Sequence, residues 1–339
     1  MVQWDVPRSS AGALMTVRLA EAHGVPADAC LRGTGLTMSD LLDPAETITA
    51  AQELGVIGNL LAAVGDASGL GLEAGALFSI STYGIWGFAL LTSPNLRSAV
   101  ETAFQFVDLS LTLTDLSRRV TGDEVQLVIT ADRVAPEQRR FVVERAAAAI
   151  QRMQNDLFTV PIRFNRVAFA FPAPAEDHGR YENVFGFTPE FDAPENVLAF
   201  DLKWLDAPLP QASELTTAMA LDQCRALLEE RRARSGLSGQ VRDMLLANLS
   251  DPPSSTAVAK ALHLGERTLR IRLAGEGTSF RALLDEVREQ LAEELLIRGR
   301  LPVSEVARRL GYVEISSFSQ AFRRWKGMGP RAYRDAALA

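Results

Sequence analysis

Cysteine is nearly absent from this sequence of 339 residues, which contains only Cys30 and Cys224. Two cysteines so far apart indicate neither a disulfide framework nor a cysteine-based metal site. Long hydrophobic runs are lacking too, because charged residues interrupt most windows of the ~18 residues that a membrane span needs. The first ten residues show no basic start followed by an apolar stretch, so we expect no secretory signal. The sequence therefore predicts a cytoplasmic protein with no metal, no cofactor and no membrane partner.

Motifs of the common catalytic and nucleotide-binding sites are also missing. The sequence has no Walker loop, no dinucleotide glycine fingerprint, no HExxH and no GxSxG. Gly69-Leu70-Gly71 lacks the strand-to-helix context that such a fingerprint needs. Acidic residues are plentiful but scattered, and no two of them can be assigned to one face. We therefore expect a binding protein and not an enzyme.

Positive charge is scarce in the chain as a whole, which has 35 Lys and Arg against 42 Asp and Glu and a net charge of −7. Residues 236–339 nevertheless hold 16 basic and 12 acidic residues, a net of +4, and the remainder holds 19 and 30, a net of −11. A basic segment joined to an acidic one is expected when only one end of a protein meets phosphate. The length and the apolar content of 47% suffice for two domains with their own cores.

The basic segment contains a two-sided helix, predicted for Ile315 to Lys326. At helical spacing one side carries Ile315, Phe318, Ala321, Phe322 and Trp325, and the other carries Ser316, Ser317, Gln320, Arg323 and Arg324. A shorter helix is predicted just before it, from Val303 to Leu310, and Gly311 ends that helix. A helix, a glycine turn and a second helix with a polar outer face form the helix-turn-helix plan, in which the second helix enters the DNA major groove.

The same pattern occurs about fifty residues earlier, at residues 256–274. The matched apolar positions are Val258, Ala259 and Leu262 with Val306, Ala307 and Leu310, then Leu269 and Leu273 with Phe318 and Phe322. This internal repeat predicts two helix-turn-helix units, residues 256–274 and residues 303–326. A long helix from Phe280 to Ile297 is predicted to join them. A rigid connector would hold the two reading helices in place for groove faces roughly 34 Å apart, one turn of B-DNA.

Two segments of the second half, "ALHLGERTLRIRLAGEGTSFRALLDEVR" and "VSEVARRLGYVEISSFSQAFRRWKGMGPRAYR", closely resemble the DNA-binding domain of AraC/XylS-type transcription regulators. The resemblance covers roughly residues 238–334. Upstream, "YGIWGFALLTSPNLRSAV" and "YENVFGFTPEFDAPENVLAFDLKWLDAPL" resemble the arabinose-binding-type effector domain of one subgroup of that family. The resemblance implies a regulator whose monomer contacts two adjacent groove segments of double-stranded DNA.

The outward residues of the two reading helices are the candidates for DNA contact. Arg267 and Arg270 suit guanine O6 and N7, Ile271 suits a thymine methyl, and Gln320 suits adenine N6 and N7. Family members often have a basic residue at the position of Ile271, so this departure predicts either a thymine preference or a lost contact. Arg323, Arg324 and Lys326 lie later, where phosphate contact is expected. The complete set of candidates is Arg267, Thr268, Arg270, Ile271, Ser316, Ser317, Gln320, Arg323 and Arg324.

The chain is predicted to be multi-domain, with an effector-binding and dimerisation domain at residues 1–212, a linker helix at 213–235 and an all-α DNA-binding domain at 236–339. Helices alternating with short strands and a hairpin predict an α/β (α+β) first domain with a mixed sheet. Its strands are expected at 111–120, 125–130, 167–171, 188–191 and 196–200. The helix at 213–235 has an equally supported alternative, a packing helix of the first domain. The glycine-rich stretch 69–87 is interpreted as a buried loop or pocket lip, with Tyr83, Trp86 and Phe88 as candidate pocket walls.

Three functions fit these features. The leading hypothesis is a sequence-specific regulator controlled by a small-molecule effector, with RNA polymerase and a second copy of the chain as further partners. The second is a constitutive DNA-binding regulator whose first domain only dimerises. The third is a DNA-repair enzyme fused to the same DNA-binding domain, which would need a reactive cysteine in an accessible, electropositive site. Neither Cys30 nor Cys224 has the surrounding sequence of such a site.

Overall fold

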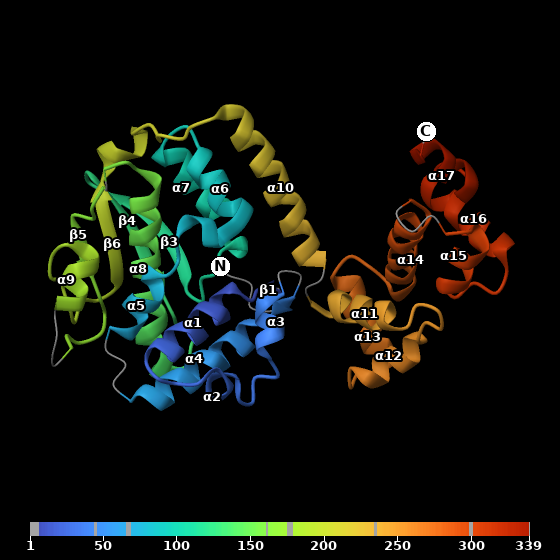
Figure 1. Ribbon diagram of the computed structural model, residues 1–339, viewed down its shortest axis with the longest axis horizontal. Coiled ribbons are helices and arrows are strands. Elements are labelled where there is room, and N and C mark those ends of the chain that lie inside the picture. Colours follow the sequence, from blue (N-terminus) through green and yellow to red (C-terminus); the bar gives the residue numbers. More distant parts are fainter. Residues whose placement is uncertain are drawn as a thin grey trace. The chain divides into compact units, whose positions relative to one another are not determined.

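The chain forms two compact units, residues 1–231 and residues 232–339 (Figure 1). The computed structural model describes residues 7–43, 46–65, 69–160, 162–174, 179–233, 236–297 and 301–338. The predicted domain limits at residues 212 and 235 stay a prediction.

The first unit is an α/β domain, as predicted. Its helices are α1 (Ala11–Ala22), α2 (Ala27–Leu31), α3 (Met38–Leu42), α4 (Ala50–Val64), α5 (Leu70–Ala76), α6 (Gly84–Thr92), α7 (Leu96–Gln105), α8 (Pro136–Leu157), α9 (Gly179–Phe185) and α10 (Glu214–Ala233), with short 3-10 helices η1 (Ile80–Tyr83), η2 (Val107–Leu109) and η3 (Leu202–Asp206). Its strands are β1 (Arg8–Ser9), β2 (Thr47–Ile48), β3 (Asp115–Thr121), β4 (Glu124–Thr130), β5 (Arg166–Ala168) and β6 (Asn196–Asp201).

The main sheet has the strand order β3-β4-β6-β5, and each of these pairings is antiparallel. Side chains alternate between its faces, because successive residues of a strand point to opposite sides. Val125 and Ile129 join the main core, and Val128 lies with Val197 on the other face. The strand predicted at 188–191 is wrong: in the described chain it is reduced to an isolated parallel bridge between Ala168 and Glu190.

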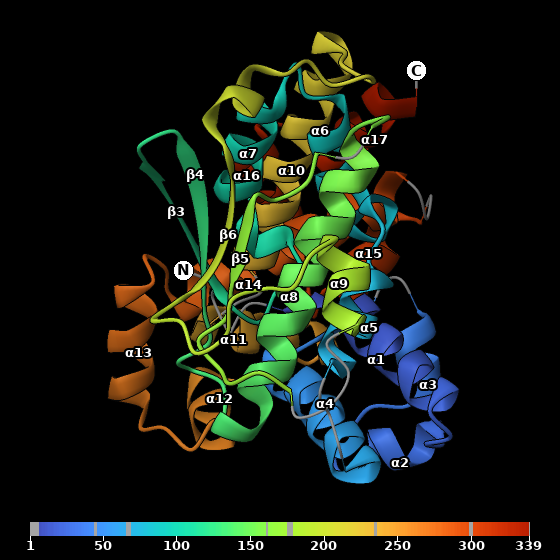
Figure 2. The ribbon, with the colours of Figure 1, turned by 90° about the vertical axis from the view of Figure 1, so that its left-hand side faces the viewer.

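Helix α8 lies between the sheet and α5 (Figure 2). Pro136 lies in the first turn of α8, where its missing amide hydrogen costs no helical hydrogen bond. The α5 helix approaches α8 closely at Gly71 and Gly75, where a Cβ atom would lie 2.3 Å from the Phe141 carbonyl oxygen and 2.4 Å from the Arg145 carbonyl oxygen. The interpretation of 69–87 as a loop is therefore wrong. Its glycines permit close helix packing, a role that local sequence does not distinguish from a turn.

Helix α10 packs on the first unit. Ala220, Cys224 and Leu228 are buried in the main core, and the Thr217 hydroxyl donates a hydrogen bond of 2.5 Å to the Thr92 carbonyl oxygen. These contacts fit the alternative of a packing helix. The helix ends at Ala233, just past the limit of the first unit, and its role as a linker stays a prediction.

The second unit is all-α, as predicted. Its helices are α11 (Gly236–Ala247), α12 (Ser255–Ala261), α13 (Glu266–Gly275), α14 (Phe280–Ile297), α15 (Val303–Arg309), α16 (Ile315–Lys326) and α17 (Pro330–Leu338). The predicted connector has the bounds of α14, which lies between the α11–α13 group and the α15–α17 group (Figure 1). Leu283 of α14 belongs to the core of the first group, and Val287 and Leu296 belong to the core of the second. One helix therefore supplies both cores.

Candidate nucleic-acid interface

Helix α13 is the second helix of the first helix-turn-helix unit. Leu269 and Leu273 are buried beneath it and fix its rotation. The four candidates on this helix, Arg267, Thr268, Arg270 and Ile271, are all exposed. The structure thus places them together on the outer face of α13, and their contact with DNA stays a prediction.

The start of α13 is tied to the start of α12. The Glu266 carboxylate accepts hydrogen bonds from the Ser255 hydroxyl at 2.7 Å and from the Thr256 hydroxyl at 3.2 Å. These bonds lower the pKa of Glu266. Because Glu266 is so engaged, the remaining outer face of α13 presents Arg267 and Arg270 with no ion pair in the part of the chain that the structure describes.

Helix α16 repeats this arrangement in the second helix-turn-helix unit. Phe318, Ala321 and Phe322 are buried, while Ser316, Ser317, Gln320, Arg323 and Arg324 are exposed. The placement of Ile315 on the inner side is wrong, since its side chain is 49% exposed. Ile315 is the first residue of the helix and lies beyond the core residues that would cover it.

Sequence reasoning missed an exposed apolar pair, Val313 and Ile315, in the second helix-turn-helix unit. Val313, in the turn before α16, is fully exposed and Ile315 follows it two residues later. Apolar side chains at the start of a reading helix can meet thymine methyl groups. The available signal was the position of Val313 in the turn between two helices, where a side chain has no neighbouring element to cover it.

The basic residues late in α16 differ in what they contact. The Arg324 guanidinium donates to Asp285 of α14 at 2.9 Å, and the Lys326 ammonium lies 3.1 Å from Glu289 and 2.7 Å from Glu293. The hydrogen bond with Glu293 raises the pKa of Lys326. Within the described residues Arg323 has no ion pair, so it presents an uncompensated charge. Our expectation of a phosphate contact at Lys326 is corrected, because its charge faces α14.

The two helix-turn-helix units are held together at two further places. Arg288 of α14 donates to the Leu310 carbonyl oxygen at 3.0 Å, and its guanidinium lies 4.5 Å from the Tyr312 ring centroid. Leu249, in the loop after α11, is buried in the core of the second group. A Cβ at Gly311 would lie 2.8 Å from the Leu249 carbonyl oxygen, so the loop and the turn are in close contact. These contacts, with α14, fix α13 and α16 relative to each other.

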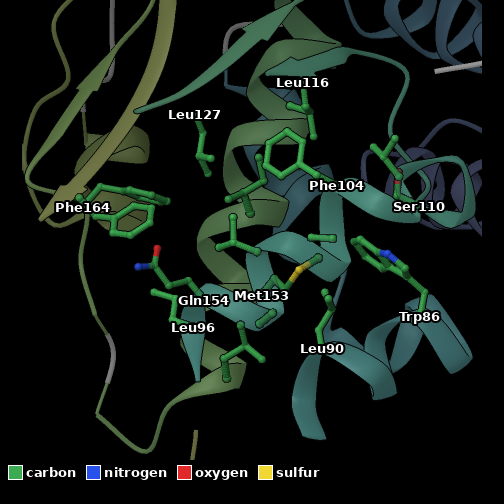
Figure 3. Close-up of a pocket in the computed structure, with 17 residues that line it drawn as sticks. Trp86, Leu90, Leu96, Phe104, Ser110, Leu116, Leu127, Met153, Gln154 and Phe164 are labelled. Atoms are coloured by element: carbon green, nitrogen blue, oxygen red, sulfur yellow. The ribbon is translucent and has the colours of Figure 1, made fainter. Parts of the chain in front are cut away.

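The first unit contains a cavity of about 110 Å³ between α6, α7, α8 and the main sheet (Figure 3). Of the candidate pocket walls, Trp86 lines this cavity and Tyr83 lines adjoining hollows, whereas Phe88 is exposed. Sequence reasoning missed Gln154, which lines the cavity from α8. Its position four residues after Ile150, on the apolar stripe of that helix, was the available signal.

The described residues give no support to a metal site, a membrane span or a reactive cysteine. No group of three or more His, Cys, Asp and Glu side chains there is placed to hold a metal ion. No single described helix is long and apolar enough to cross a membrane, and residues 70–76 with 80–92 reach that length only as a pair bent by 79°. Both thiols are buried, and burial raises the pKa of Cys30 and of Cys224. A raised pKa disfavours the thiolate that a reactive cysteine needs.

Comparisons with known proteins match both units. Residues 24–209 match the family described as the arabinose-binding domain of AraC transcription regulator, N-terminal, and residues 258–336 match one described as a helix-turn-helix domain. An uncharacterized HTH-type transcriptional regulator of Mycobacterium tuberculosis is 34% identical over 319 residues, which cover 93% of this chain and 92% of the relative. The ornithine utilization regulator of Pseudomonas aeruginosa is 34% identical over 278 residues, covering 79% and 78%. Among solved structures, CdpR of Pseudomonas aeruginosa is similar over 99% of both chains, at 24% identity and a TM-score of 0.48.

Proposed function

The chain belongs to the AraC-type transcription regulators with an arabinose-binding-type domain ahead of the helix-turn-helix domain, and on that premise we propose that a small molecule bound in the first unit controls its affinity for a specific DNA site. A molecule can do this only if it binds one arrangement of the protein more tightly than another. The relatives are transcription regulators, which favours a regulatory role over a catalytic one.

One observation carries the DNA-binding half of this proposal. The outer faces of α13 and α16 are exposed and polar, and both helices are fixed to the shared helix α14. A single chain can therefore address two neighbouring windows of the major groove with a set spacing, about one helical turn of DNA apart. The proposed contact residues are Arg267, Thr268, Arg270, Ile271, Ser316, Ser317, Gln320, Arg323 and Arg324.

Selection of binding sites from a random duplex pool by the full chain tests this proposal. We expect an asymmetric site with two conserved blocks whose centres lie roughly one turn of B-DNA apart. Replacing Arg267 should reduce the sequence conservation of one block, and replacing Gln320 should reduce that of the other. Recovery of sequences with a single block, sensitive to only one of the two residues, would overturn the two-window arrangement.

The alternative of a constitutive regulator differs in the first unit. If that unit only dimerises, no small molecule should change the melting temperature or the DNA affinity of the chain. The cavity beside Trp86 favours ligand control, because a largely apolar pocket with a few polar groups is the usual form of a small-molecule site. The repair-enzyme alternative is disfavoured by the burial of both thiols.

Three further features complete the proposed function. The first unit contributes to a homodimer, RNA polymerase is a partner at the promoter, and the protein acts in the cytoplasm, where bacterial DNA lies. Sedimentation of the full chain with and without a DNA duplex would measure the oligomeric state. A species with the mass of a single chain under both conditions would contradict the homodimer.

A further inference from the structure

The walls of the cavity in the first unit are almost entirely carbon. Trp86 and Leu90 come from α6, Phe104 from α7, Met153 from α8, and Phe200 from β6. Its volume of about 110 Å³ is of the same order as the ~150 Å³ apolar cavity that takes up a benzene ring in an engineered protein. The space therefore suits a single ring or a short acyl chain.

Two polar side chains in this wall are buried without a hydrogen-bond partner. Gln154 is 6% exposed, and neither the nitrogen nor the oxygen of its side-chain amide has a hydrogen-bond partner among the described residues. Trp86 is 5% exposed, and its indole nitrogen has no partner there either. In the view of Figure 3 Gln154 and Phe164 lie toward one side of the cavity and Trp86 toward the other. A buried amide with no partner is unfavourable, since it has lost its bonds to water. A bound molecule with one group that both donates and accepts would satisfy Gln154.

Charge is lacking around this cavity. Its described lining contains no Lys, Arg, Asp, Glu or His. The buried cation Arg145 lines an adjoining hollow and is already paired with Glu53 at 2.8 Å. The Arg118 guanidinium lies 5.7 Å from the Phe104 ring centroid, but Arg118 is exposed and does not line the cavity. A charged ligand would therefore be desolvated here without a counter-ion, which is strongly unfavourable.

We propose that this cavity is the effector site and that it takes an uncharged, mostly apolar small molecule with one carboxamide or hydroxyl group held by Gln154. This inference rests on the proposed function for its regulatory meaning, but not for its chemistry. A sugar does not fit: Gln154, the Trp86 indole and Ser110 are too few polar partners for its several hydroxyl groups, which would be buried against carbon.

The cavity adjoins a hollow bordered by α10. Trp86 lines both the cavity and an adjoining hollow, whose wall includes Leu227 and Arg231 of α10. Arg231 donates to the Asp108 carbonyl oxygen at 3.3 Å, beside η2 and Val107 of the cavity wall. A ligand that shifts Trp86 would therefore move a side chain of the hollow that α10 borders.

Isothermal titration of the full chain with four probes tests the chemical class. Benzamide is uncharged with one amide, benzoate is its charged counterpart, toluene lacks the polar group, and L-arabinose is the sugar. We expect benzamide to bind at least about tenfold more tightly than benzoate, and L-arabinose not to bind. Tighter binding of benzoate or of L-arabinose than of benzamide, or no binding of benzamide at all, would overturn the assignment.

Two glutamines on α8 provide a matched pair of variants. Gln154→Leu should weaken benzamide about tenfold and leave toluene unchanged or tighter, because only benzamide uses the amide. Gln151→Leu is the control: Gln151 is equally buried, donates to Asn155 at 2.9 Å and does not line the cavity. It should change the affinity for either probe less than twofold. Equal effects of both variants on benzamide would refute a direct contact with Gln154.

A third variant tests whether binding is lost through the cavity itself and not through misfolding. Ala99→Leu, from α7, fills the cavity and should abolish binding of benzamide and of toluene while the melting temperature holds or rises. Retained binding would place the probes elsewhere and overturn the site. DNA affinity measured with saturating benzamide is a separate readout. If it does not change although the binding results hold, effector control by this pocket fails while the pocket chemistry stands.

Discussion

His263 and Gly311 occupy the same position in the two helix-turn-helix turns, and both have left-handed backbone, with φ of +54° and +75°. The flanking hydrogen bonds repeat as well: the Leu264 amide donates to the Ala259 carbonyl at 2.8 Å, and the Tyr312 amide donates to the Ala307 carbonyl at 2.9 Å. Both turns are thus Schellman motifs, in which the left-handed residue favours glycine. The sequence repeat is therefore a repeat of backbone conformation, with a strained residue in one copy.

His263→Gly should stabilise the second unit by about 0.5–1 kcal/mol. Histidine is unfavourable in left-handed backbone by about 1–2 kcal/mol, and the greater freedom of glycine in the unfolded chain offsets part of the gain. His263 is exposed, so no packing is lost. Calorimetric unfolding of the full chain measures the change. A lower melting temperature would show that the imidazole stabilises the turn.

Gly311→Ala should have the opposite effect, a loss of about 2–3 kcal/mol. The new Cβ adds left-handed strain and would lie 2.8 Å from the Leu249 carbonyl oxygen and 3.0 Å from the Ser250 carbonyl oxygen. Gly275→Ala is the matched control, because no neighbouring atom lies within 4 Å of its added Cβ and its φ is not positive. The control should stabilise α13 slightly. Similar calorimetric losses in both variants would contradict this account of Gly311.

The stability of the second unit should fall in acid through Glu276. Its carboxylate caps α11, accepting from the Leu237 amide at 3.0 Å and the Ser238 amide at 2.8 Å. Burial alone would raise the pKa of Glu276, but the hydrogen bonds from Ser238 and Leu237 outweigh it and lower the pKa. A folded-state pKa below the unfolded value, about 4.3, gives a stabilisation that is complete above that value and is lost as pH falls through the folded pKa.

Glu276→Gln should therefore reduce stability at pH 7 by about 0.5 kcal/mol, since the side chain is exposed and solvent weakens its bonds. The difference from the unmodified chain should shrink as pH is lowered below about 4. Urea unfolding at several pH values measures it. A difference that stays constant from pH 7 to pH 3 would show that the charge of Glu276 is not involved.

How far the sequence predicted this structure depended on how local the signal was. The second unit was predictable because α13 and α16 are amphipathic and repeated, so the burial of Leu269 and Phe318 follows from spacing alone. The ion pair of Arg324 with Asp285 was not predictable, because it joins α16 to α14 and the pattern of one helix does not show how a second helix is rotated against it. The position of Lys326 was misjudged for the same reason.

The first unit was harder to predict, and the reason is visible at Gly71 and Gly75. Glycine usually marks a turn, yet here it allows α5 to approach the carbonyl groups of α8, a contact between segments far apart in sequence. The position of Gln154 on an apolar stripe indicates a buried amide, but only the neighbouring elements show that it lines a cavity and has no hydrogen-bond partner among the described residues. Cavities arise from several elements at once, and local periodicity does not predict them.

Gln320→Ala should relax base preference at one operator position by about 1–3 kcal/mol. Gln320 is exposed on α16 and has no hydrogen-bond partner among the described residues, so its amide is available to an adenine edge. Competition binding with duplexes that vary one base pair at a time measures the preference. Ser319→Ala, a neighbouring half-buried position, is the control and should leave the preference intact. An equal loss for every duplex after Gln320→Ala would assign Gln320 to the DNA backbone.

Arg323 and Arg324 are adjacent arginines with different expected contributions to DNA affinity. Arg323→Ala should weaken all duplexes alike and reduce the slope of log affinity against log salt by about one unit, because one phosphate contact releases about one counterion. Arg324→Ala should reduce that slope less, because Asp285 already neutralises part of its charge at 2.9 Å. Asp285→Asn removes that competitor and should strengthen binding at low salt. Titrations at several salt concentrations measure all three variants, and a larger slope change for Arg324→Ala than for Arg323→Ala would reverse the assignment.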